Sequence, residues 1–184
     1  VLLALETGGD HLGVALWRLA EKNDPSGQSW RLLEEVSQQR GHRHADTILS
    51  LVDEMLTRHE LSPSDLSLIA VGRGPGGFTG VRVGMATALG LGQGLGALVW
   101  PVDSLMALAM NGAMGSAPVL ALIDARKGEV YGGVYHFDPA GDVTCLMEPV
   151  VAPADQVVEQ ARAVSQELII LGSGALVSGH ASPV

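Results

Sequence analysis

The order of extended and helical segments constrains the fold of this chain more than any other feature of its sequence. Three strand-type runs come first and are separated by turn residues. Apolar residues then fall at helical spacing, and a strand, a second helix and a short strand follow. The predicted segments of this first half are residues 1–6, 11–19, 30–37, 46–59, 66–71, 79–94 and 98–102.

This order is that of the ribonuclease-H-like unit from which actin-like folds are built, so we expect an α/β first lobe. After a further predicted helix, a poorer version of the pattern follows, without the last helix of a complete unit. Its strands are expected at residues 119–124, 129–137, 143–151 and 168–171, with a helix at 155–164. We therefore expect two ribonuclease-H-like lobes, residues 1–102 and 103–184, of which the second is shortened.

The charge of the chain argues against RNA binding through its own surface. Twenty Asp and Glu against eleven Lys and Arg give a net charge of −9, whereas RNA-binding domains normally carry a basic stripe. We expect a partner protein to make the contact with any nucleic acid. Without a basic leader or a stretch of transmembrane length, the chain is expected to be cytoplasmic. Its single cysteine, Cys145, excludes an internal disulfide and is expected to be buried.

A glycine-rich segment at residues 72–84 lies between a predicted strand and a predicted helix. There, backbone N–H groups can approach a phosphate. The segment contains G-x-G-x-x-G, but no Lys-Ser/Thr follows to make a Walker loop. Either its glycines allow a tight turn and close packing, or they form a phosphate cradle with a helix N-cap threonine and a first-turn arginine. The residues of this candidate cradle are Gly74, Gly76, Gly77, Thr79 and Arg82.

As a longer string, the segment 72–84 resembles the signature of the TsaB (YeaZ) family. Further matches occur in the same order along the chain, at residues 3–7, at His44 with Ile48, at 123–131 and at 172–174. Two positions depart from the family pattern, because Glu6 stands where Asp is usual and Gly8 where Ser is usual.

The resemblance implies an actin/Hsp70-like (ASKHA) fold and a role as non-catalytic partner of a TsaD-type threonylcarbamoyl transferase. That pair makes threonylcarbamoyladenosine (t6A) at tRNA position 37. It implies pairing with the TsaD-like subunit through two first-lobe helices, a homodimer when alone, a TsaE-like ATPase reached through the complex, and only indirect contact with tRNA. The expected interface residues are Leu49, Met55, Leu56, Gly84 and Gly92.

The resemblance also bears on catalysis. The catalytic relative holds a metal through H-x-x-x-H on the helix after the fifth strand, and alignment places Ser104 and Leu108 at those positions. Neither side chain can replace an imidazole ligand. We therefore expect no metal, no catalytic residue and no required cofactor, with weak ATP/Mg binding left open. The alternatives are a nucleotide-binding enzyme that uses the 72–84 loop and, least supported, a metallopeptidase.

Overall fold

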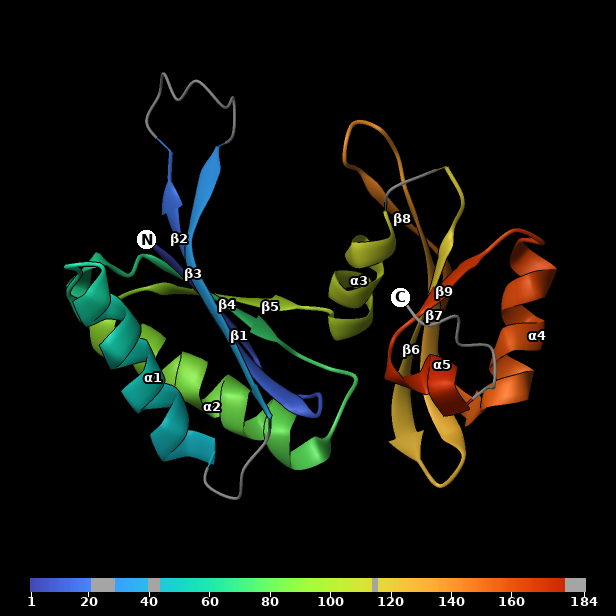
Figure 1. Ribbon diagram of the computed structural model, residues 1–184, viewed down its shortest axis with the longest axis horizontal. Coiled ribbons are helices and arrows are strands. Elements are labelled where there is room, and N and C mark those ends of the chain that lie inside the picture. The colour runs from blue at the N-terminus through green and yellow to red at the C-terminus, as the bar shows by residue number, and fades with distance from the viewer. Residues whose placement is uncertain (21–28, 40–43, 114–115, 178–184) are drawn as a thin grey trace. The chain divides into compact units, whose positions relative to one another are not determined.

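The computed structural model describes residues 1–20, 29–39, 44–113 and 116–177 (Figure 1). The chain divides into two compact units, one of Val1–Arg73 with Gly77–Val102 and one of Gly74–Gly76 with Asp103–Val184. Each unit has its own sheet and its own buried apolar clusters. The predicted α/β class is therefore confirmed, and the chain forms two separate sheets, as expected for two lobes.

The first unit contains a five-stranded sheet in the order β3-β2-β1-β4-β5. β1 pairs antiparallel with β2 and parallel with β4, while β2–β3 is antiparallel and β4–β5 is parallel. Because β1 and β4 are parallel neighbours, their carboxyl ends lie at the same edge of the sheet. The strands are β1 (Leu2–Glu6), β2 (His11–Leu19), β3 (Trp30–Gln39), β4 (Leu68–Gly72) and β5 (Leu98–Val102).

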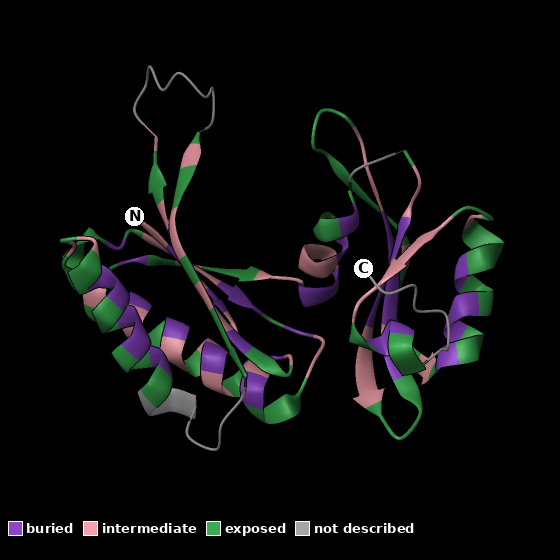
Figure 2. Cartoon of the chain, viewed as in Figure 1, coloured by how far each residue is buried: buried purple, intermediate pink, exposed green. Residues whose placement is uncertain are grey.

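Two long helices, α1 (His44–Arg58) and α2 (Phe78–Leu95), lie side by side on one face of this sheet (Figure 1). Alternate strand residues such as Leu3 and Leu5 point toward the helices and are buried, as the period of two requires. Each helix is buried along the stripe that faces the sheet and exposed on the opposite side (Figure 2). A short 3-10 helix, η1 (Pro63–Asp65), precedes β4.

The second unit contains a four-stranded sheet in the order β8-β7-β6-β9. Alternate residues of β6 enter two different clusters, Leu120 and Leu122 with α4 and α5 on one face, and Val119 and Ala121 with α3 on the other. Helices therefore cover both faces of this sheet. Its elements are α3 (Ser104–Ala109), η2 (Met110–Gly112), β6 (Val119–Arg126), β7 (Glu129–Phe137), β8 (Val143–Pro153), α4 (Ala154–Val164), β9 (Ile169–Leu171) and α5 (Ser173–Val177).

Three predicted strands, 11–19, 98–102 and 129–137, match the observed bounds, and the other predicted elements differ at their ends. The short helix α5 was not expected, since the sequence indicated only a glycine turn there. The expectation of a buried cysteine was wrong. Cys145 lies exposed on β8, which is an edge strand of its sheet. None of the helices within the described residues combines the length and apolarity that a membrane crossing requires.

Candidate functional site

The glycine-rich loop leaves the carboxyl end of β4 and enters α2, and it is held by backbone hydrogen bonds. The N–H of Arg73 donates to the carbonyl of Val102 at 2.8 Å, and the N–H of Gly77 donates to the carbonyl of Gly8 at 2.7 Å. The carbonyl of Gly74 accepts from the N–H of Ser104 at 2.9 Å. The backbone of the loop is thus joined to neighbouring segments of the protein.

An acidic side chain lies against the start of this loop. The Glu6 carboxylate, at the end of β1, would collide with a Cβ at Gly72, and its Oε1 accepts the Gly8 N–H at 2.6 Å. Gly72 is therefore required for close packing against Glu6. Because like charges repel, a carboxylate at this edge disfavours a phosphate in the same place.

The residues of the candidate phosphate cradle lie in the loop after β4 and in the first turns of α2. The prediction that Thr79 is the N-cap of α2 was wrong. The helix begins at Phe78, and its N-cap is Gly77, which has no side chain to cap the helix. Thr79 and Arg82 are exposed. The guanidinium of Arg82 lies 3.7 Å from the centre of the Phe78 ring, in a cation–π contact at the helix start. Gly74 is buried and Gly76 is half-buried.

The inward face of α2 is formed by small residues because the sheet lies very close to it. Thr7 is buried at the end of β1, and its hydroxyl donates to the Gly80 carbonyl at 2.8 Å. A Cβ at Gly84 would collide with that hydroxyl, and a Cβ at Gly92 would collide with the Val99 side chain. These glycines allow α2 to pack on its own sheet.

Four of the five expected interface residues are consequently corrected. Gly84 and Gly92 face inward, as just described, and Met55 and Leu56 belong to the apolar core of the first unit with exposed fractions of 0% and 2%. A buried side chain offers no surface to a partner. Only Leu49, which is 48% exposed, lies on the outside of α1.

The outward face of α2 contains two glycines that the sequence interpretation did not select. A Cβ at Gly90 or Gly94 would meet nothing within 4 Å. Next to Gly90, Leu89 is 54% exposed. The spacing groups Gly84 with Gly92 on one helix face and Gly90 with Gly94 on another, but it does not say which face meets the sheet.

The positions aligned with a metal site carry no ligand in this chain. Ser104, the first residue of α3, is 7% exposed, and Leu108 packs in the apolar cluster beneath α3. Asp103 instead caps α3, since its Oδ1 accepts the Met106 N–H at 3.0 Å. In the part of the chain that the structure describes, no three His, Cys, Asp or Glu side chains are grouped so as to hold a metal ion.

In the second unit, the motif at residues 123–131 forms the hairpin between β6 and β7. The Asp124 side chain accepts the Arg126 N–H at 2.7 Å and pairs with the Arg126 guanidinium at 3.4 Å. The Asp124 N–H donates to the hydroxyl of Ser173 at 3.1 Å, which ties the hairpin to the start of α5. This places the glycine turn at residues 172–174 next to the hairpin motif.

Comparisons with known proteins agree with this architecture. The family model described as "TsaD: tRNA N6-adenosine threonylcarbamoyltransferase" matches residues 32–164. The chain is 34% identical over 175 residues to the tRNA threonylcarbamoyladenosine biosynthesis protein TsaB of Escherichia coli (strain K12). The matched region covers 94% of this chain and 71% of that protein. It is 38% identical over 132 residues to the protein of the same name from Haemophilus influenzae, covering 71% of this chain and 51% of that protein.

A solved structure gives the same result. The structure titled "YeaZ from Pseudomonas aeruginosa" superposes with a TM-score of 0.79 at 30% sequence identity, covering 100% of this chain and 80% of that one. The chain thus spans between about half and four fifths of the length of these relatives.

Proposed function

Because this chain belongs to the TsaB (YeaZ) family, we propose that it acts in making threonylcarbamoyladenosine on tRNA, as a non-catalytic subunit that pairs with a TsaD-type transferase. The relatives are named for the biosynthesis of this modified nucleoside. The strand order β3-β2-β1-β4-β5, with α1 and α2 on one face, supports a ribonuclease-H-like first lobe of the actin/Hsp70-like type. The second sheet repeats the first four strands of that order.

The absence of imidazole ligands from the aligned positions supports a non-catalytic role. The buried Ser104 and the apolar Leu108 leave no pair of histidines on α3 to hold a metal. The transfer chemistry would then belong to the partner, and this chain would contribute a surface. By the same proposal it forms a homodimer when alone, and it meets a TsaE-like ATPase only within the complex.

The observation that carries this proposal is the outward face of α2. Gly90 and Gly94 have open space above them. Glycine inside an exposed helix costs about 0.5–1 kcal/mol relative to alanine, so two on one face need a reason. In this proposal the reason is the close approach of a partner helix, with the exposed Leu49 of α1 and Leu89 of α2 as candidate apolar contacts.

The test is capture of a TsaD-type subunit by Gly90→Arg and Gly94→Arg variants. A large charged side chain at a close helix contact should cost about 1–3 kcal/mol through overpacking, and more because its charge is buried without a partner. Both variants should keep wild-type circular dichroism and lose capture in a pull-down. The matched control is Ala163→Arg, an exposed position of α4 in the second unit, which should capture normally.

Two results would count against this face. Folded Gly90→Arg and Gly94→Arg proteins that still capture the partner would show that α2 is not the interface. Failure of the wild-type chain to capture any TsaD-type subunit would remove the proposed function itself.

A further inference from the structure

The hairpin between β6 and β7 carries a backbone conformation that its residues do not favour. Arg126 pairs with Glu129 in the ladder, which leaves Lys127 and Gly128 as the two turn residues. φ is +73° at Arg126, +56° at Lys127 and +82° at Gly128. Glycine adopts such angles without cost, whereas residues with a Cβ other than Asn and Asp rarely do. Two successive long cationic residues in this region are therefore not explained by the needs of the turn.

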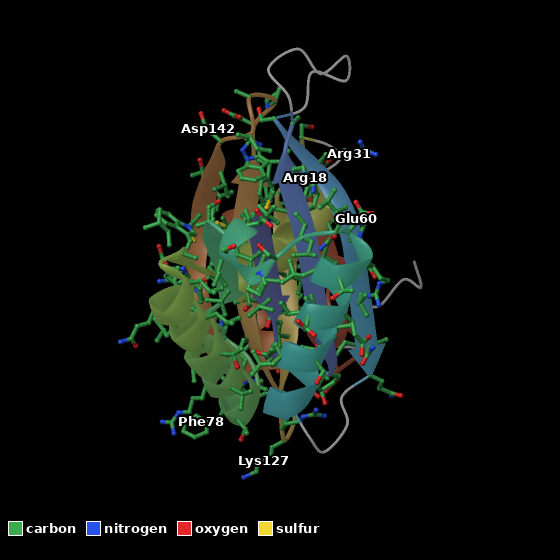
Figure 3. All side chains as sticks on the ribbon, turned by 90° about the vertical axis from the view of Figure 1, so that its left-hand side faces the viewer. Arg18, Arg31, Glu60, Phe78, Lys127 and Asp142 are labelled. Carbon is green, nitrogen blue, oxygen red and sulfur yellow. The ribbon has the colours of Figure 1, made fainter. Side chains whose placement is uncertain are left out.

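The same two residues stand out in the charge pattern of the chain. The sequence has eleven Lys and Arg against twenty Asp and Glu. Arg126-Lys127 is the only place in it where two Lys or Arg residues are adjacent. The Arg126 side chain is 70% exposed although it also pairs with Asp124, and Lys127 is exposed. Figure 3 shows the Lys127 side chain extending away from the ribbon.

From this strained, cationic tip we propose that Arg126 and Lys127 contact the phosphate backbone of RNA, an inference that rests on the proposed role in tRNA modification. A chain with a net charge of −9 repels a polyanion unless cations stand away from the acidic body. At physiological ionic strength, salt largely screens charges that are more than about 8 Å apart. A phosphate that approaches the tip therefore responds mainly to the two cations there and less to acidic residues further away. The contact would add to the RNA contacts of the partner subunit.

An acidic protein surface is the other ligand that two cations could meet. Protein interfaces bury an apolar centre within a polar rim, yet Gly128 and Glu129, which follow the two cations at the tip, are exposed and offer no apolar side chain. Phosphate contacts, by contrast, need only charge and hydrogen-bond donors. The composition of the tip therefore favours RNA.

The test measures tRNA binding by the complex of this chain with a TsaD-type subunit over a range of salt concentrations. Each lost phosphate contact should reduce the slope of log K against log salt by about 0.7–0.9. We expect a reduction of that size for Lys127→Asn and about twice that for Arg126→Ala/Lys127→Asn. Arg162→Ala, which removes one exposed cation from α4, should leave the slope unchanged.

Asparagine is chosen at position 127 because it tolerates positive φ while removing the charge. If Lys127 had only a structural role, Lys127→Asn would keep or raise thermal stability and leave RNA binding alone. The inference requires stability to be kept and the salt slope to fall.

Three results would overturn the inference. A pull-down that measures capture of the TsaD-type subunit by each variant distinguishes among them. An unchanged slope in an intact complex would refute the RNA contact alone. Weaker capture of the partner subunit by the hairpin variants would assign the tip to protein binding instead. Failure of the wild-type pair to assemble would refute the proposed function together with this inference.

Discussion

Thr7 and Gly84 pack so closely that a Cβ at Gly84 would collide with the Thr7 hydroxyl, which itself donates to the Gly80 carbonyl at 2.8 Å. One side chain thus fixes both the distance between β1 and α2 and the residue type that α2 can carry there. The glycine-rich loop joins β4 to α2 at the edge where β1 and β4 end.

Gly84→Ala should destabilise the protein by about 1–3 kcal/mol, because the added methyl group displaces a buried side chain. Thr7→Ala should cost about 1 kcal/mol or more for the lost buried hydrogen bond and the lost packing. In the double variant the hydroxyl is gone and the methyl group has room. A double-mutant cycle in urea should therefore give a total cost below the sum of the two. Strict additivity would show that the two residues do not meet.

Gly90→Ala and Gly92→Ala should have opposite effects, although the positions are two residues apart on one helix. Alanine at the open position 90 should stabilise the isolated chain by about 0.5–1 kcal/mol. Alanine at position 92 should destabilise it, because its Cβ would collide with Val99 and lie 3.1 Å from the Ala97 carbonyl oxygen. Thermal unfolding of both variants checks the pair. Equal shifts of the same sign would contradict the assignment of the two faces.

Glu34 on β3 should make stability depend on pH in the acid range. Its carboxylate accepts from Arg58 at 2.7 Å and contacts His59 at 3.0 Å, and the hydrogen bond from Arg58 is the main cause that lowers its pKa below the ordinary value of 4.5. A lowered pKa gives stability that is complete above 4.5 and is lost as the pH falls through the folded-state value.

Glu34→Gln should therefore lower the melting temperature at pH 7, by the equivalent of no more than about 1 kcal/mol for a partly exposed pair. The difference from wild type should shrink below pH 4.5. Glu35→Gln, a neighbouring exposed carboxylate on the same strand, serves as the control. A gap between Glu34→Gln and wild type that persists unchanged at pH 3 would argue against the contribution of the carboxylate.

ATP with magnesium should bind the isolated chain weakly. The Gly77 N–H is already donated to Gly8, the Glu6 carboxylate lies against the loop, and there is no Walker lysine. Calorimetry should give no sub-micromolar dissociation constant, and Arg82→Ala should behave as the wild type does. A sub-micromolar constant that Arg82→Ala abolishes would favour the nucleotide-binding enzyme.

Purified protein should retain no stoichiometric transition metal. The positions that would supply imidazole ligands hold Ser104 and Leu108, and neither can bind zinc or iron as an imidazole does. Elemental analysis after dialysis against a chelator checks this. About one zinc or iron per chain after that treatment would refute the prediction and reopen the question of catalysis.

Apart from the short helix α5, the sequence by itself determined the types and order of the main helices and strands in both units, because local periodicity reflects which residues along one segment are buried. Strands with clear turn residues at both ends, such as 11–19 and 129–137, were placed to the residue. The glycine string at 72–84 likewise indicated the family, since it extends well beyond a generic turn. Element ends were less certain at α2, where the cap is the backbone of Gly77 and no side chain marks it.

Only the tertiary structure decided which face of α2 meets the sheet. The sequence of this helix, FTGVRVGMATALGLGQGL, has small and apolar residues on every side and few polar ones, so its outside is only weakly marked. Which pair packs inward, Gly84 with Gly92 or Gly90 with Gly94, was therefore undecided until Thr7 and Val99 were placed beside the first pair. Burial of a glycine depends on what approaches it, and those side chains come from strands far away in the sequence.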